Sequence, residues 1–111
     1  MKFDTLIKGG LVATAEGVFP ADVAIRGEKI AAVGAGLADM AQADKVIDAT
    51  GHYVMPGVLD VHVHLELPFC GTTSSDDYRT GTRAGARGGV TTLIDFAIPY
   101  RKDGKYEALS Q

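Results

Sequence analysis

The sequence lacks several features that mark particular classes of protein. It has a single cysteine, Cys70, so no disulfide can form within the chain. No apolar run reaches the roughly 18 residues of a membrane-spanning helix, and charged residues follow Met1 too closely for a signal peptide. The 11 basic and 14 acidic side chains give a net charge of −3, without a basic cluster suited to nucleic acid. We therefore expect a cytoplasmic protein with no membrane or nucleic-acid partner.

The length and composition are those of one globular domain. The chain has 111 residues, of which 46% are hydrophobic and 23% charged, as in ordinary folded proteins. One domain commonly has about 100 to 150 residues. A complete (β/α)8 barrel needs roughly 250 residues and is therefore excluded.

Residues 1–55 are predicted to form short β-strands separated by glycine-containing turns. Their spacing is typical of hairpins or a meander. The predicted strands cover residues 3–8, 11–13, 21–25, 29–33, 45–48 and 52–55. This region is too small and too rich in glycine for a strong core, so we expect it to contribute to a larger, composite sheet.

Pro56 and Gly57 end this pattern and predict a domain boundary between residues 55 and 56. Residues 56–111 then form the second region, whose first part has the pattern of a βαβ unit.

The predicted βαβ unit begins with an apolar strand over residues 58–65 and ends with another over 90–96. Between them, Ser74 or Ser75 is predicted to cap a helix that runs to about Arg87. A strand, helix and strand of this length imply a parallel pair. A second helix is predicted from residue 106. Two parallel strands cannot cover their own faces, so the sequence indicates part of a larger α/β protein.

The strongest chemical signal is the segment Asp60-Val61-His62-Val63-His64. Side chains alternate along a strand, which predicts that Asp60, His62 and His64 share one face. The two histidine Cα atoms would be about 6.6 Å apart, so both imidazoles can reach one metal ion. Asp60 is a candidate for a supporting contact to these ligands.

An ordinary amphipathic strand with a polar face toward water is the alternative. In a βαβ unit, however, both faces of the strand are covered, and polar side chains there require a partner. The histidines also lie at the carboxyl end of the strand, where α/β proteins build their sites. Asp95, at the end of the second strand, either lines the same site or caps the following loop. His52 is expected at the surface, and Cys70 is not expected to be a reactive thiol.

The segment from Met55 to His64 resembles the metal-binding opening of the amidohydrolase superfamily, PG-x-x-D-x-H-x-H. Further segments closely resemble dihydropyrimidinases and D-hydantoinases, a family within it. These segments are LIKGG (6–10), IDATG (47–51), LELPFCGT (65–72), SDDY (75–78), GTRAGA (81–86) and GGVTTLIDF (88–96).

This resemblance implies the N-terminal part of a (β/α)8 barrel, preceded by strands of a small β-sandwich. It also implies a binuclear zinc centre, in which His62 and His64 bind the more buried metal ion. The family's carboxylated lysine, two further histidines and catalytic aspartate would all lie beyond Gln111. No catalytic acid or base is therefore expected in this segment.

The implied function is hydrolysis of a ring amide in dihydropyrimidines or 5-substituted hydantoins, giving N-carbamoyl amino acids. Leu65, Leu67 and Phe69 would lie on a loop that bounds the substituent of the ring. Dihydroorotases carry an arginine for a substrate carboxylate where this chain has Glu66, which favours a cyclic ureide without that carboxylate. The resemblance also implies a homo-oligomer, a tetramer, for the full-length protein.

Three other hypotheses remain at this point. The chain is a non-catalytic, dihydropyrimidinase-like scaffold, an inactive truncated product, or a small metal-binding module complete in itself. The scaffold proteins lack the HxH pair that this chain retains. We expect the 111 residues alone to be inactive.

Overall fold

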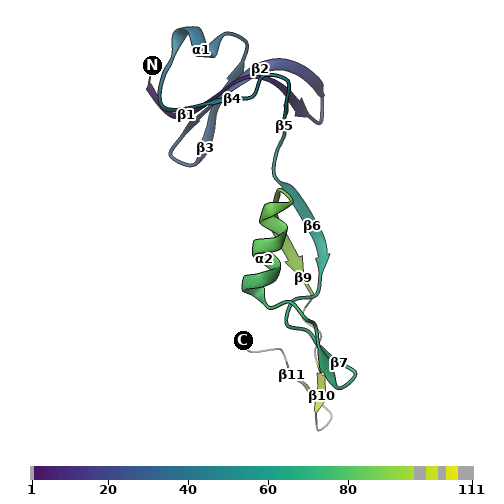
Figure 1. The fold of residues 1–111 in the computed structure, drawn as a ribbon. Helices are drawn as coiled ribbons and strands as arrows, with labels where there is room; N and C mark the ends of the chain where they lie inside the picture. Colours follow the sequence, from purple (N-terminus) through teal and green to yellow (C-terminus); the bar gives the residue numbers. More distant parts are fainter. Residues whose placement is uncertain (1, 97–99, 103–104, 108–111) are drawn as a thin grey trace. The chain divides into compact units, whose positions relative to one another are not determined.

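The computed structural model describes residues 2–96, 100–102 and 105–107. The chain divides into two compact units, Met1–Pro56 and Gly57–Gln111 (Figure 1). This division falls one residue after the predicted boundary. No helix in the described part of the chain has the length and apolar character needed to cross a membrane.

The first unit is a five-stranded sheet in which β1 is central. β2 pairs with it antiparallel, β3 pairs antiparallel with β2, and β4 and β5 both lie parallel to β1. The strands are β1 (Lys2–Thr14), β2 (Gly17–Arg26), β3 (Lys29–Gly34), β4 (Gln42–Asp48) and β5 (Tyr53–Val54). The first three strands form the predicted meander, and the later two return along β1.

Two details of this sheet differ from the prediction. The strands expected over 3–8 and 11–13 are one strand, because a shift of register between Ile7 and Gly10 lets β1 continue. A Cβ atom at Gly10 would lie 2.6 Å from Val54 Cγ2, so glycine permits the close approach of β5. The second difference is a short helix, α1 (Leu37–Met40), where only a turn was predicted.

The core of the first unit is small and includes one buried carboxylate. Phe3, Leu6 and Ala24 form one buried cluster, and a second lies around Val12. Asp22 is only 7% exposed and accepts hydrogen bonds from Gly9 N (2.9 Å) and Ala38 N (3.0 Å). It therefore links the irregular part of β1 to α1.

The second unit contains the predicted βαβ arrangement. β6 (Val58–Val63) and β9 (Val90–Asp95) are parallel neighbours, and α2 (Tyr78–Arg87) connects them and contacts β9 (Figure 1). A hairpin of β7 (Pro68–Phe69) and β8 (Thr72–Thr73) interrupts the loop before α2. The carboxyl ends of β6 and β9 therefore lie at one edge.

After β9, the chain forms a hairpin of β10 (Tyr100–Lys102) and β11 (Lys105–Glu107). The prediction of a helix from residue 106 is wrong at its first two positions, and residues 108–111 lie outside the described part.

The cap of α2 also corrects the prediction, because neither Ser74 nor Ser75 provides it. Asp77 is the N-cap: its carboxylate accepts from Thr80 N (2.6 Å), and Thr80 Oγ1 accepts from Asp77 N (3.0 Å). These reciprocal bonds form a capping box. The Thr80 amide and hydroxyl hold the pKa of Asp77 below its usual value. Ser74 Oγ accepts instead from Leu67 N (2.8 Å), which fixes the loop.

Candidate functional site

The two histidines of the HxH segment meet at the carboxyl end of β6. Their Nε2 atoms are 3.1 Å apart, and their rings are nearly perpendicular, with centroids separated by 5.0 Å. Two nitrogens that bind the same tetrahedral zinc ion, each at about 2.05 Å, are about 3.3 Å apart. Both side chains are exposed. The observed separation is therefore close to that of two nitrogens on one zinc ion, and it is also within hydrogen-bonding distance.

The pair supplies only part of a metal site. Among residues 2–96 and the two short strands after them, no group of three metal-ligating side chains gathers. Structural and catalytic zinc sites use three or four protein ligands. The two imidazoles fit zinc in type and separation, and a complete site would need donors from outside the described residues.

Asp60 contacts the backbone of the histidine segment. Its Oδ1 accepts from His62 N at 3.1 Å. The register between β6 and β9 shifts between Asp60 and Val63. An irregularity of this kind changes the direction in which nearby side chains point. The Asp60 carboxylate thus supports His62 through its backbone amide, which lies in this irregular part of the strand.

Phe96 is a site residue that the sequence analysis did not single out. Its ring lies 4.3 Å from the His62 ring and 5.7 Å from the His64 ring, measured between centroids. The available signal was its position directly after β9, at the edge where β6 also ends. An aromatic wall against His62 restricts the orientations of that imidazole.

Asp95 lies beside the same edge and gathers several hydrogen bonds. Its Oδ1 accepts from Phe96 N (2.8 Å) and Leu65 N (3.4 Å). A hydrogen bond with Asp95 raises the pKa of the Tyr78 hydroxyl. Desolvation acts to raise the pKa of Asp95, but the bonds from Tyr78 and the two amides hold it below its usual value. Asp95 therefore accepts from amides just after both β6 and β9, whereas the capping hypothesis concerned only the loop after β9.

The three apolar residues predicted to bound the substrate pocket lie in different surroundings. Leu65 packs against α2, where a Cβ atom at Gly81 would lie 2.3 Å from Leu65 Cδ2. Leu67 is half-buried and is bonded through its backbone to Ser74. Phe69 is 61% exposed on β7. Phe69 is thus the most accessible of the three, while Leu65 contributes to helix packing.

The remaining histidine, His52, and Cys70 both lie at the surface, as expected for His52. His52 belongs to the first unit and is exposed, with Nδ1 3.0 Å from Thr50 O. Cys70 is exposed at the turn of the β7–β8 hairpin, where its φ of 50° and that of 80° at Gly71 form the tight turn.

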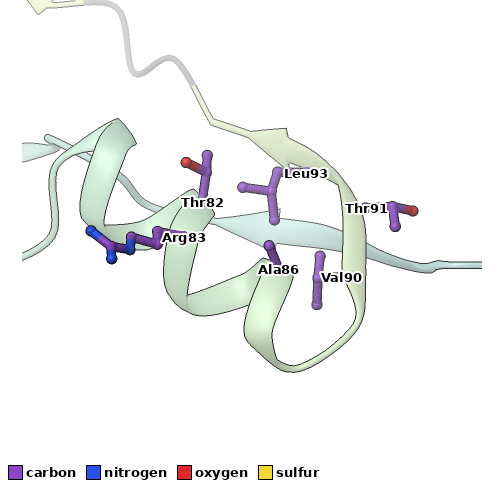
Figure 2. Close-up of a pocket in the computed structure, with 6 residues that line it drawn as sticks. All are labelled: Thr82, Arg83, Ala86, Val90, Thr91 and Leu93. Carbon is purple, nitrogen blue, oxygen red and sulfur yellow. The ribbon is translucent and has the colours of Figure 1, made fainter.

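A hollow of about 630 Å³ lies between α2 and β9 (Figure 2). Thr82, Arg83 and Ala86 line it from the helix, and Val90, Thr91 and Leu93 line it from the strand. Arg83 is the one charged side chain of this lining. The hollow therefore offers no acid–base pair for hydrolysis.

Comparison with known proteins connects this geometry to a family of enzymes, although no protein-family model matches the chain. The D-hydantoinase of Streptomyces coelicolor is 50% identical over 101 residues, which are 88% of this chain and 22% of the relative. An allantoinase of Salmonella paratyphi B is 44% identical over 98 residues, or 88% of this chain and 20% of the relative. The chain thus spans about a fifth of the length of these curated relatives.

Solved structures give the same result. D-Hydantoinase from Bacillus sp. AR9 matches with a TM-score of 0.81 and 45% identity, over 90% of this chain and 21% of that one. An N-acyl-D-glutamate deacylase from Bordetella bronchiseptica, solved with zinc, matches with a TM-score of 0.63 and 32% identity, over 84% of this chain and 18% of that one. These matches show that the chain is homologous to a segment of D-hydantoinases and allantoinases, as the amidohydrolase resemblance of its HxH segment implies.

Proposed function

We propose that the chain is the N-terminal segment of a zinc-dependent cyclic amidase, in which His62 and His64 bind zinc. The observation that carries this proposal is the 3.1 Å separation of the two Nε2 atoms at the end of a parallel strand. The zinc in the related deacylase structure supports the choice of metal.

The proposed enzyme has a (β/α)8 barrel that continues from β6, α2 and β9. The exposure of apolar side chains on these two strands supports this. Leu59 is 59% exposed, Val61 60% and Ile94 49%, and a parallel sheet ordinarily has both faces covered. The sheet of the first unit would belong to a composite β-sandwich.

Zinc would supply a hydroxide near neutral pH and polarise the carbonyl group of the ring amide. This chain would hold and orient the metal through His62 and His64. Phe96 packs on the His62 ring, and Asp60 bonds the His62 amide, so both limit movement of that ligand. The bridging carboxylated lysine, the second metal's ligands and the proton donor would come from the rest of the enzyme.

The proposed substrate is a five- or six-membered cyclic ureide without a ring carboxylate, opened to its N-carbamoyl acid. Glu66 supports this, because its carboxylate accepts from Tyr78 N at 3.2 Å and would repel an anionic substituent. The exposed ring of Phe69 suits an alkyl or aryl substituent. The names of the relatives, D-hydantoinase and allantoinase, fit the same substrate class. We also propose a homo-oligomer, a tetramer, located in the cytoplasm.

In the non-catalytic scaffold hypothesis the histidine pair would have no function, and its convergent geometry argues against that hypothesis.

The test is to purify the full-length protein, measure its zinc by elemental analysis and assay hydantoin and dihydrouracil. We expect about two zinc ions per subunit, a two-metal arrangement known among hydrolases. His62→Ala and His64→Ala should each lower zinc content and abolish hydrolysis, because each removes a metal ligand.

His52→Ala is the matched control, since it removes the remaining histidine from the other unit. Unchanged zinc in both ligand variants would overturn the metal assignment. Turnover of dihydroorotate, with none of hydantoin or dihydrouracil, would overturn the substrate proposal.

A further inference from the structure

The Asp95 carboxylate connects three segments of the second unit. Its Oδ1 accepts from Phe96 N, just after β9, at 2.8 Å and from Leu65 N, just after β6, at 3.4 Å, and the Tyr78 hydroxyl at the start of α2 acts to lower the pKa of the same carboxyl. Tyr78 is also fixed at its amide, which donates to Glu66 Oε1 at 3.2 Å. The first residue of α2 is therefore held through its main chain, and its hydroxyl interacts with the Asp95 carboxylate.

Both amides bound by Asp95 adjoin a side chain of the histidine site. Leu65 directly follows His64, and Phe96 stacks its ring on His62 at 4.3 Å between centroids. A shift of the carboxylate would therefore move the backbone next to one ligand and the aromatic wall of the other.

The strand ladder alone does not fix this edge. The register of β6 on β9 is irregular between Asp60 and Val63, and Val63 pairs with Asp95 itself. His64 lies beyond the end of β6. After the last paired residues, the next hydrogen bond between the two segments is the one that Leu65 N donates to Asp95 Oδ1. Hydrogen bonds to an ionised carboxylate are stronger than neutral ones.

We propose that Asp95, held by the Tyr78 hydroxyl, is a positioning residue that sets the separation of the His62 and His64 Nε2 atoms. Neither residue binds the metal in this role. The inference rests on the proposed zinc site, and it concerns how the site is held rather than whether it exists.

The experiment measures zinc affinity by competition with a chromophoric chelator, using the full-length protein stripped of metal. Loss of a group that orients a metal ligand typically weakens binding about 10- to 100-fold, and we expect this for Asp95→Ala. Tyr78→Phe removes one hydroxyl and should weaken binding about fivefold. Asp95→Asn keeps an acceptor for the two amides and should retain most of the wild-type affinity.

The matched control is Thr82→Val, because among the described residues Thr82 Oγ1 donates to two carbonyl groups within α2, those of Tyr78 and Arg79. It should leave zinc affinity unchanged. Each variant is also loaded with Co²⁺, whose visible absorption reports the geometry of the ligands. We expect an altered cobalt spectrum for Asp95→Ala and Tyr78→Phe, and a wild-type spectrum for Thr82→Val.

Wild-type zinc affinity and cobalt spectra in both Asp95→Ala and Tyr78→Phe would overturn this inference and leave the proposed function intact. Should Asp95→Ala not fold, Tyr78→Phe alone decides between the outcomes. Failure of the wild-type protein to bind zinc would overturn the proposed function together with this inference.

Discussion

Replacing Gly57 by alanine should destabilise the second unit, because no space exists for the added methyl group. A Cβ atom at this position would lie 2.1 Å from Thr91 Oγ1, 2.2 Å from Cγ2 and 2.7 Å from Cβ. Rotation of the Thr91 side chain cannot move its Cβ, so the backbones of β6 and β9 must separate. The backbone of Gly57 has no positive φ, and the cost is therefore steric.

Overpacking of this kind costs about 1–3 kcal/mol, and we place Gly57→Ala at the upper end. The control is Gly85→Ala within α2, where the nearest contact is Val90 Cβ at 3.4 Å. That change replaces a poor helix former by the best one and gains up to about 1 kcal/mol.

The assay is urea unfolding of the full-length protein and both variants. We expect the midpoint of Gly57→Ala below that of the wild type and the midpoint of Gly85→Ala at or above it. Equal midpoints for Gly57→Ala and the wild type would show that β6 and β9 are not as close as the structure has them.

Three further predictions concern the first unit and the isolated chain. Asp22→Asn should cost about 1.5–3 kcal/mol of unfolding free energy, because Gly9 N donates to Oδ1 and Ala38 N to Oδ2, and an amide has only one acceptor oxygen. A loss below about 0.5 kcal/mol, the size of an ordinary surface change, would contradict this. The Ala38 and Gly9 amides hold the pKa of Asp22 below its usual value. The stabilisation that Asp22 gives the fold is therefore complete above about pH 4 and is lost as the pH falls through the lower pKa of the folded state. In acid titrations, Asp22→Asn should lose less unfolding free energy than the wild type. The 111-residue chain alone should associate through its exposed apolar faces, which sedimentation would reveal. With added zinc, it should open the ring of neither hydantoin nor dihydrouracil. Ring opening above that of a His62→Ala control would refute the expected inactivity.

Local periodicity was sufficient to predict the main elements of the second unit and the histidine pair. Alternation along 58–64 anticipated that His62 and His64 would converge, and the strand, helix and strand lengths anticipated a parallel pair. The glycines after α2 and the meander of the first three strands are equally consequences of local rules.

The helix cap and the contacts around the histidines could not be predicted from local sequence. Several residues near the start of α2 could have capped the helix, and the contacts join residues distant in the sequence. Ser74, Ser75 and Asp77 are all good N-caps, and the Thr80 side chain decided in favour of Asp77 through the capping box. The contact of Phe96 with His62 and the bond of Asp95 to Leu65 join residues about 30 positions apart. Strand register determines such contacts, and periodicity does not reveal an irregular register.

The central claim is that His62 and His64 bind the same zinc ion. The most direct measurement is anomalous diffraction at the zinc edge from crystals of the full-length protein. We predict a zinc peak about 2.0–2.1 Å from the Nε2 atoms of both histidines. A hydrogen bond between the two imidazoles with no metal at the site, in crystals whose zinc lies elsewhere, would contradict the claim.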